Sequence, residues 1–411
     1  LQDAGLQPGQ RVAARIPNGV AYVQAMLGVW GAGGVFCPLP VGLEDQEVER
    51  RLGIMDVAAF IDGEITVEAM VQGLKIPIES EAHQDLPEVR LLLWTSGSQG
   101  LAKVVPIRDS NLVHQVDTHL KFLNIGTHST VVNYLSWSHC FGGILELMCS
   151  LFAGAVIEVP SPERFHLERI SHALERAEHP VFFSVPKVIK QLSERSNGRL
   201  LLAKIEEGII GGAPVNGELA GILTRAGCRM RIGYGQTECT PGIMLGQPGF
   251  FTANYLGFPI GCEVRMDANN VLEVKGENLS DPNTEWWNTG DVVVRNPDGS
   301  YSLKGRVGRS WKWSNGRMFH PEPEEQLLSE RLRTDVIVAK KNGDAAFGIA
   351  RGEGTWPLRD LGASPYVSDG IYLAEEIWQM AVGSTGKLDY ALLSELGARA
   401  LAAQQATVVE V

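Results

Sequence analysis

The sequence predicts an α/β protein with a large N-terminal domain of mostly parallel sheets flanked by helices and a small α+β domain after it. Short apolar runs alternate with helical patterns through the first half, which is the βαβ rhythm of a parallel sheet. From about Leu256 the pattern changes to short strand-like pieces with turns such as Asn296–Gly299, which is typical of β-hairpins. The residues after the Gly305–Arg309 phrase then form a unit of their own. We therefore expect domains at 1–307 and 308–411.

The elements follow this rhythm in order. A strand is expected at 11–16, a helix at 21–30 and a strand at 33–39; further strands are expected at 91–93, 131–134, 155–159, 181–185 and 208–210, and a terminal helix at 398–406. The glycines at 28, 31, 33 and 34 end a helical pattern and do not join a strand to a helix. They therefore predict close packing of the helix and not a dinucleotide-binding turn.

Composition restricts the partners of the chain. The 411 residues carry a formal net charge of −12 and show no run of Lys and Arg, which argues against nucleic acid and anionic membranes as partners. No apolar stretch reaches the roughly 18 residues of a membrane span, and no secretory signal is visible. Six cysteines without a C-x-x-C pair indicate free thiols in a cytoplasmic protein. The chain opens without an initiator Met, so we expect an N-terminal piece before it.

The segment from Thr95 to Lys103 predicts a polyphosphate site. It follows the apolar run 91–93 and combines hydroxyls, glycines and a lysine, in the order Thr95, Ser96, Gly97, Ser98, Gln99, Gly100 and Lys103. Glycines let the backbone approach a ligand, and successive N–H groups in such a loop form a concavity for an anion. The spacing differs from that of a Walker loop.

Four later segments carry further chemistry. His139 stands in Trp137-Ser138-His139-Cys140-Phe141-Gly142-Gly143, where the alternative is a packed core histidine. The Gly211-Gly212-Ala213 run offers bare backbone to a flat ring, and Tyr234-Gly235-Gln236-Thr237-Glu238 places a ring, a hydroxyl and a carboxylate together. Glu238 is a candidate ligand of Mg²⁺, which prefers carboxylates plus substrate phosphates. Asp291 in Thr289-Gly290-Asp291 can accept hydrogen bonds from ribose hydroxyls, the alternative being a turn cap.

Taken in order, these motifs resemble those of the adenylate-forming superfamily of acyl- and aryl-CoA synthetases, luciferases and peptide-synthetase adenylation domains. The series is T-S-G-S-x-G-x-x-K, W-S-H-x-F-G-G, G-G-A-P, Y-G-Q-T-E, T-G-D, G-R and G-K, and it extends from Gln10 to Lys387. The resemblance implies a distorted β-barrel subdomain within the large domain and a mobile C-terminal cap. Gly308 takes the hinge position, where the family usually has Asp or Lys.

The resemblance also implies roles for the residues. The loop from Thr95 to Lys103 would hold the β- and γ-phosphates of ATP, and Gln99 replaces the more usual Thr there. Adenine would lie beside Gly211, Gly212, Ala213, Tyr234 and Gly235, and ribose beside Asp291 and Arg306. Thr237 would contact the α-phosphate, Glu238 would bind Mg²⁺, and His139 would stand at the mouth of the acid pocket. Lys387, in Gly386-Lys387, would lie between the carboxylate and the α-phosphate.

The implied reaction is the ATP- and Mg²⁺-dependent activation of an aryl or acyl carboxylic acid, with release of pyrophosphate. The acyl-adenylate would then pass to a thiol, either CoA or the phosphopantetheine of a carrier protein. Two alternatives stay open at this point: transfer to an amine with formation of an amide, and a non-catalytic relative that binds nucleotide only.

Overall fold

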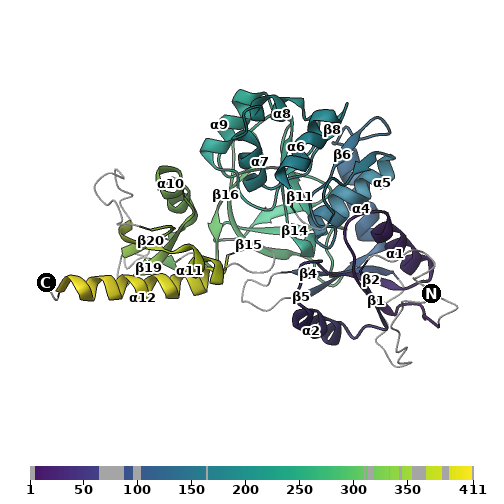
Figure 1. The fold of residues 1–411 in the computed structure, drawn as a ribbon, viewed down its shortest axis with the longest axis horizontal. Helices are drawn as coiled ribbons and strands as arrows, with labels where there is room; N and C mark the ends of the chain where they lie inside the picture. The colour runs from purple at the N-terminus through teal and green to yellow at the C-terminus, as the bar shows by residue number, and fades with distance from the viewer. Residues whose placement is uncertain are drawn as a thin grey trace.

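The computed structural model describes residues 5–63, 88–95, 103–162, 165–309, 311–312, 318–332, 334–341, 345–353, 367–381 and 388–409. Helices and sheets in the first three quarters of the chain form one body, and the C-terminal elements form a smaller lobe beside it (Figure 1). The expected α/β fold with a large first part and a small α+β second part is therefore confirmed.

The first sheet has helices on both of its faces. Its described strands lie in the order β3 (Ala59–Asp62), β1 (Arg11–Arg15), β2 (Val35–Pro38), β4 (Val89–Thr95) and β5 (Lys103–Arg108), and only β4 and β5 are antiparallel. Helix α1 (Val20–Gly31) packs on the face that carries Val12 and Phe36, whereas α2 (Asp45–Met55) packs on the face that carries Ala13 and Val35. Neighbouring residues of one strand point to opposite faces, so both faces must be apolar and both are covered.

The central sheets are continuous through two isolated bridges. The parallel strands β7 (Val156–Glu158), β6 (Thr130–Val132) and β8 (Pro180–Val181) pair side by side. Bridges at Val181–Glu207 and Ser184–Ile210 connect them to the eight-stranded sheet. That sheet runs in the order β13 (Glu263–Met266), β14 (Val271–Lys275), β15 (Trp287–Arg295), β16 (Tyr301–Arg306), β12 (Tyr255–Pro259), β11 (Gly242–Leu245), β10 (Arg231–Gly235) and β9 (Ile209–Ile210).

The antiparallel part of this sheet occupies the place of the expected distorted barrel. Its described strands, from β13 to β10, form an open order and do not close on themselves. The predicted hairpin turn is confirmed: it joins β15 to β16, Asn296 N donates to Ser300 O, and Gly299 has a φ of 89°.

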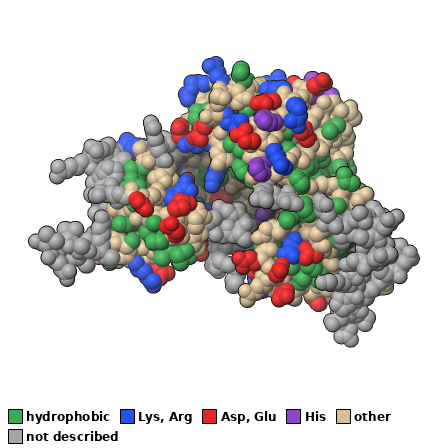
Figure 2. Space-filling view, viewed as in Figure 1, with side chains coloured by type: hydrophobic (Ala, Val, Ile, Leu, Met, Phe, Trp, Pro, Cys, Tyr) green, Lys and Arg blue, Asp and Glu red, His purple; other side chains and the backbone are tan. Residues whose placement is uncertain are grey.

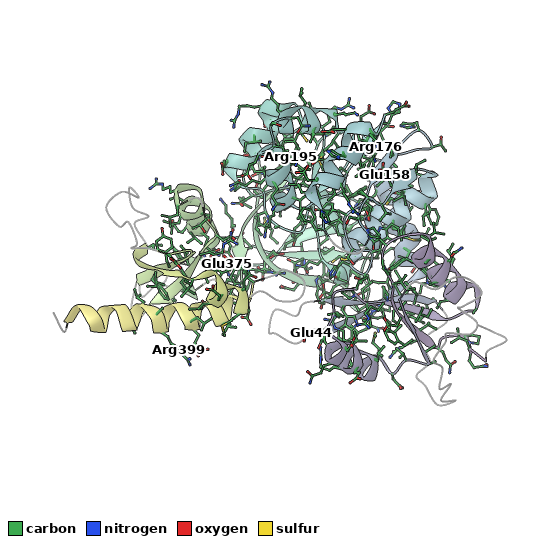
Figure 3. All side chains as sticks on the ribbon, viewed as in Figure 1. Glu44, Glu158, Arg176, Arg195, Glu375 and Arg399 are labelled. Carbon is green, nitrogen blue, oxygen red and sulfur yellow. The ribbon has the colours of Figure 1, made fainter. Side chains whose placement is uncertain are left out.

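Helices cover the central sheets. Three of them precede β7 in the chain: α4 (Asp109–Leu120), the π-helix η1 (Phe141–Met148) and α5 (Cys149–Ala153). Those of the upper layer in Figure 1 are α6 (Leu167–Arg176), α7 (Pro186–Ser193), α8 (Gly198–Lys204) and α9 (Gly217–Ala226). Arg176 at the end of α6 forms an ion pair of 2.5 Å with Glu158 of β7, and the two lie close together in Figure 3. Leu174, Ile189, Leu202 and Leu223 from the four helices share one buried cluster.

The C-terminal lobe is a small α+β unit. It contains β17 (Trp311–Lys312), β18 (Met318–Phe319), α10 (Glu322–Leu332), β19 (Val336–Lys341), β20 (Ala345–Arg351), β21 (Val367–Leu373), α11 (Glu375–Met380) and α12 (Tyr390–Val409). The last of these contains the predicted terminal helix. Acidic and basic side chains are interspersed over the face of the molecule seen in Figure 2. Among the described helices, none has the length and apolar character needed to cross a bilayer.

The prediction for the early glycines is right only in part. A Cβ added to Gly34 would lie 3.1 Å from Gln10 O and from Val29, so this residue does allow close packing. At Gly28 and Gly31 an added Cβ would meet no described atom within 4 Å, so the prediction is wrong there. Both glycines lie on the exposed side of α1. Their spacing marks one side of the helix correctly, but that side faces away from the core.

Candidate active site

The Asp291 carboxylate is the point where three of the predicted segments meet. Arg306 Nε lies 2.9 Å from Oδ1, and the two residues are register partners in β15 and β16. Tyr234, from the end of β10, donates its hydroxyl to Oδ2 at 2.7 Å. Burial and the negative charge of Asp291 raise the pKa of Tyr234 well above its usual value. The phenol therefore stays protonated and acts as a donor.

Gln236 completes this arrangement, and the sequence assigned it no role. Its Nε2 donates to Asp291 Oδ2 at 3.0 Å and to Thr289 O at 2.8 Å, while its Oε1 accepts from Trp287 Nε1 at 3.1 Å. Asp291 is 6% exposed and lies inside β15, so it is not a turn cap. The whole T-G-D motif lies within β15, which begins at Trp287.

Glycines in two motifs are required by close approach or by backbone conformation. A Cβ on Gly235 would lie 1.8 Å from Pro241 O, because β10 and β11 slip out of register at this point. A Cβ on Gly211 would lie 3.2 Å from Gly233 O and 3.4 Å from the Phe141 ring. Gly212 has a φ of 80°, in the left-handed region. Gly211 is buried, whereas Gly212 and Ala213 are exposed and leave bare backbone at the surface.

Thr237 and Glu238 lie in a single 3₁₀ turn, η2 (Thr237–Cys239), which α4 holds in place. Gln115 of α4 donates to Cys239 O at 3.1 Å and to Gly242 O at 3.0 Å. Because α4 follows β5 directly, these bonds tie the T-E turn to the strand that carries Lys103. The Thr237 hydroxyl lies 3.2 Å from Cys140 Sγ, next to His139.

Glu238 has the properties of a Mg²⁺ ligand. Its carboxylate is half-buried and, within the described residues, has no hydrogen bond or ion pair of its own. Mg²⁺ is commonly bound by one or two carboxylates together with substrate phosphates, so a single carboxylate next to the Thr237 hydroxyl fits this ion. Among the described residues, no three His, Cys, Asp or Glu side chains group together as an all-protein metal site would need.

The ends of the phosphate loop are described, and the loop itself is not. Thr95 and Lys103 are register partners at the ends of the antiparallel strands β4 and β5, and Thr95 Oγ1 donates to Lys103 O at 3.5 Å. The loop therefore connects two rigid strands, as the sequence predicted for its first end. Ser96, Gly97, Ser98, Gln99, Gly100 and Lys387 lie outside the described residues.

His139 occupies a tight turn before η1. Its N–H donates to Ser136 O at 3.2 Å, and its carbonyl accepts from Gly143 N at 2.7 Å. The residue is half-buried and not enclosed, which favours a site histidine over a packed core histidine.

The structure thus brings together Tyr234, Asp291 and Arg306 by direct bonds, and it brings Thr237 to the His139–Cys140 turn. Sequence reasoning missed Gln236, Cys140 and Gln115. Gln236 and Cys140 stand inside the recognised motifs and could have been found from their position. Nothing in the sequence marks Gln115, since its partners are backbone carbonyls more than a hundred residues away.

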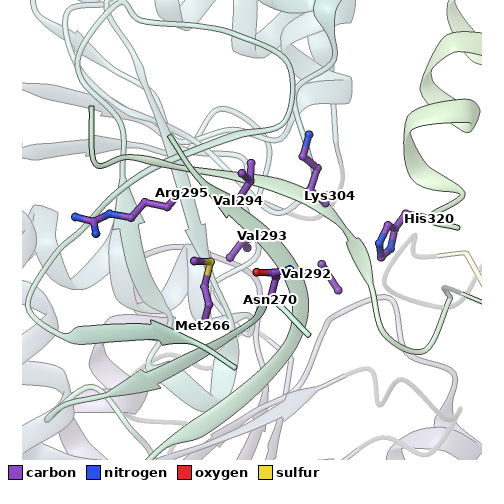
Figure 4. Close-up of a pocket in the computed structure, with 8 residues that line it drawn as sticks. All are labelled: Met266, Asn270, Val292, Val293, Val294, Arg295, Lys304 and His320. Carbon is purple, nitrogen blue, oxygen red and sulfur yellow. The ribbon is translucent and has the colours of Figure 1, made fainter. Parts of the chain in front are cut away.

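A separate hollow of about 370 Å³ lies elsewhere, on the β14–β16 side of the sheet (Figure 4). Val292, Val293, Lys304 and His320 are among its lining residues. None of the residues predicted to bind ATP or the acid lines this hollow, so we do not place the chemistry there.

Comparison with known proteins decides the family. The family of AMP-binding enzymes matches residues 1–300. The chain belongs to this family. The feruloyl-CoA synthase of an Amycolatopsis species is 26% identical over 368 residues, which span 80% of this chain and 74% of that protein. The peptide synthetase CymA of Salinispora arenicola is 23% identical over 430 residues, 92% of this chain but 5% of that protein.

A solved structure supports the fold. O-succinylbenzoate coenzyme A synthetase from Bacillus subtilis, in complex with ATP and magnesium ion, matches with a TM-score of 0.76 at 19% identity, over 90% of this chain and 87% of that one. Membership of the AMP-binding family confirms the expected class, an AMP-forming acid–thiol ligase that uses ATP and Mg²⁺.

Proposed function

We propose that this AMP-binding enzyme activates an aryl or acyl carboxylic acid as its adenylate and transfers the acyl group to the thiol of CoA. The observation that carries the proposal is the convergence on Asp291 of Arg306, Tyr234 and Gln236, which come from three strands or turns. A carboxylate held at both oxygens by donors is fixed in orientation and can present its remaining lone pairs to ribose hydroxyls.

The chemistry of the first step follows from charge. A carboxylate must attack a triphosphate that is also negative. Donors and cations around the α-phosphate lower this barrier, because they stabilise the charge that builds on its oxygens and on the departing pyrophosphate. In our proposal Thr237 donates to the α-phosphate, Glu238 holds Mg²⁺, and the Thr95–Lys103 loop binds the β- and γ-phosphates. Mg²⁺ supplies charge neutralisation on the phosphate oxygens. Lys387 would bring the two anions within reach of each other.

An aromatic acid is our first choice of substrate. The ring of Phe141 lies beside Gly211, 3.4 Å from where a Cβ would stand, and packs edge-on against Phe183 with ring centroids 6.2 Å apart. Such a wall suits a flat ring, and the similarity to feruloyl-CoA synthase supports the same class of acid. The phosphopantetheine of a carrier protein is the alternative thiol, and the similarity to CymA supports it. A cytoplasmic location is also part of the proposal.

We further propose that Gly308 separates a large domain, 1–307, from a cap domain, 308–411, that moves between the two half-reactions. Val307 N donates to Gly290 O at 2.9 Å, which fixes this residue to the large domain. The Arg309 side chain pairs with Glu325 and stacks on the Tyr390 ring at 3.7 Å, which attaches it to the cap, while its backbone N–H donates to Arg306 O at 3.0 Å. Between them, an added Cβ on Gly308 would meet no described atom within 4 Å. The change of attachment across one residue supports a hinge there.

Pyrophosphate exchange with a panel of acids tests the first step. The panel should include ferulate, benzoate, octanoate and malonate, each with ATP and Mg²⁺, and CoA is then added to detect the thioester. We expect exchange with the aromatic acids and thioester with CoA. Adenylate formation without thioester would favour a carrier protein, and a product with an added amine would favour an amide-forming ligase. Absence of acid-dependent exchange would contradict the proposal.

Lys387→Ala tests the role given to that lysine. We expect the exchange rate to fall by about a hundredfold or more while the affinity for ATP changes little, because the lysine acts on the reacting groups and not on the nucleoside. An unchanged rate would remove Lys387 from the mechanism.

A further inference from the structure

A buried carboxyl lies directly behind the His139–Cys140 turn. Glu146 of η1 is 0% exposed, and burial raises its pKa to about 8. Its Oε1 accepts hydrogen bonds from Asn133 Nδ2 and, at 3.1 Å, from Trp137 Nε1. Its Oε2 has no partner among the described residues. None of the ion pairs of the described chain includes Glu146, so the group is held as an acceptor of hydrogen bonds and not as half of a salt bridge.

Trp137, the partner of this carboxyl, is held on every polar group. Its indole N–H donates to Glu146, its backbone N–H donates to Asn18 Oδ1 at 3.1 Å, and its carbonyl accepts from the Tyr22 hydroxyl at 2.8 Å. Asn18 also donates to Asn133 Oδ1 at 2.8 Å, which closes the network. The network connects α1, the loop after β6 and η1.

The two glycines of the motif bring η1 against this segment. A Cβ on Gly142 would lie 2.4 Å from Ser136 O, and a Cβ on Gly143 would lie 2.4 Å from Trp137 O. The chain therefore reverses direction between Trp137 and Gly143, and the start of η1 packs so closely on Ser136 and Trp137 that no Cβ fits at either glycine. His139 and Cys140 stand at the outer end of that fold, where Cys140 meets the Thr237 hydroxyl at 3.2 Å.

We propose that Glu146 is a positioning residue, whose Oε1 fixes Trp137 and Asn133 and through them holds the His139–Cys140 wall of the acid pocket against Thr237. An effect of Glu146 on binding of the acid rests on the function proposed above, whereas its effect on the position of the His139–Cys140 turn does not. A purely packing role would not need a carboxyl, because an aliphatic side chain of the same size would avoid the cost of desolvating a polar group. What the carboxyl adds is direction: one oxygen accepts from two donors that belong to different segments.

The chemistry of Cys140 gives a test that needs no substrate. Cys140 and Cys262 are half-buried, whereas Cys37, Cys149, Cys228 and Cys239 are buried. The folded protein without nucleotide is treated with iodoacetamide, and mass spectrometry measures the rate at which Cys140 is alkylated. This rate reports how firmly the turn is held. Digestion of the alkylated protein before mass spectrometry distinguishes Cys140 from Cys262. Glu146→Leu removes both acceptor contacts, and Glu146→Gln keeps Oε1. Leu147→Ala is the matched control, because Leu147 is also 0% exposed in η1 but lies outside the network.

We expect Glu146→Leu to raise the alkylation rate of Cys140 about tenfold, since the loss of two buried hydrogen bonds favours local opening, and Glu146→Gln to stay within about twofold of wild type. Leu147→Ala should lower the melting temperature and leave Cys140 at its wild-type rate. Trp137→Phe removes the indole donor together with part of the buried ring, and it serves in place of Glu146→Leu if that variant does not fold. The proposal is overturned if Cys140 is alkylated at the same rate in the test variant, Glu146→Leu or its substitute Trp137→Phe, as in the control Leu147→Ala.

Kinetics with ferulate supply the second readout. We expect Glu146→Leu to raise the KM for ferulate about tenfold with the KM for ATP unchanged, and Glu146→Gln to restore it. A rise in both constants together, or no rescue by Gln, would assign Glu146 to stability alone. If wild type shows no exchange with any acid, the proposed function fails, and the alkylation result still decides the positioning role.

Discussion

Tyr234 donates its hydroxyl to Oδ2 of Asp291 at 2.7 Å, although the two residues are 57 positions apart in the sequence. The tyrosine ends β10, next to the parallel edge of the eight-stranded sheet, and the aspartate lies in its antiparallel part. One hydrogen bond therefore joins the two halves of that sheet at the proposed nucleotide site. Because Gln236 and Arg306 bind the same carboxylate, its orientation is set before a nucleotide arrives.

The first prediction concerns the carboxylate of Asp291. Asp291→Asn keeps the shape but replaces one acceptor oxygen by an N–H₂ group, which meets the donors of Arg306 or Gln236. Hydrogen bonds to a charged group are worth about 1.5–3 kcal/mol each, so we expect kcat/KM for ATP to fall about a hundredfold. The constants for the acid should change little. ATP–pyrophosphate exchange at varied ATP concentration measures both.

Asp298→Asn is the control for this prediction. Asp298 lies in the turn between β15 and β16, is exposed, and undergoes the same chemical change. Wild-type kinetics are expected there. A loss for Asp298→Asn equal to that for Asp291→Asn would show that the hairpin as a whole, and not the Asp291 carboxylate, governs ATP use.

The second prediction contrasts two glycines. Gly235→Ala places a Cβ 1.8 Å from Pro241 O, so β10 and β11 must separate beside the T-E turn. We expect a loss of about 3 kcal/mol or more in the free energy of unfolding. Gly28→Ala places its methyl group in open space on the exposed side of α1, where Ala is favoured over Gly by up to about 1 kcal/mol. Urea unfolding of both variants should give changes of opposite sign; two changes of the same sign would refute the comparison.

The sequence supported the order of strands and helices and the position of most site segments, since both depend on local information. Apolar runs marked β1, β2 and β4, and the turn at Asn296–Gly299 marked the β15–β16 hairpin. The Y-G-Q-T-E and T-G-D motifs marked the residues that meet at Asp291. The same reasoning was wrong for Gly28 and Gly31, because spacing along a helix does not say which side faces the core.

The rest depends on contacts that sequence does not display. Gln115 matters because α4 happens to pass the carbonyls of Cys239 and Gly242, and a glutamine in a helix gives no sign of that. Glu146, Asn133 and Asn18 are polar residues that would ordinarily be placed at the surface. They form one network, buried at Glu146 and Asn133 and half-buried at Asn18, only because three separate elements meet there, which is a property of packing and not of any one segment.

The third prediction follows from the pKa of Glu146. Burial raises this pKa from 4.5 to about 8, so between these values the native protein binds a proton that the unfolded chain has released. The contribution of this group to stability is therefore complete below about pH 4.5 and is lost as the pH rises through 8. The slope amounts to at most about 1.4 kcal/mol per pH unit. In Glu146→Gln this slope is absent.

Urea unfolding of wild type and Glu146→Gln at pH 5.5, 6.5, 7.5 and 8.5 measures the effect as a difference. We expect wild type to lose stability relative to the variant as the pH rises, with the difference levelling off above about pH 8. A constant difference across the series would mean that the carboxyl is ionised throughout and that burial does not control its titration.

The fourth prediction concerns the hinge. The Val307 backbone is bound to Gly290 and the Arg309 side chain to Glu325, so in our proposal a change of cap orientation is absorbed at Gly308. Proline at this position fixes φ near −65° and restricts Val307 as well, whereas alanine restricts it far less. Gly308→Pro should therefore leave one half-reaction near its wild-type rate and slow the other, by about tenfold or more if cap movement becomes limiting. Single-turnover pyrophosphate release and thioester formation report the two halves separately, with Gly308→Ala as the control. Equal slowing of both halves would indicate a folding defect, and no slowing of either would place the pivot away from Gly308. The Val307 backbone is attached to the large domain and the Arg309 side chain to the cap, so a hinge at Gly308 predicts a selective effect on one half-reaction.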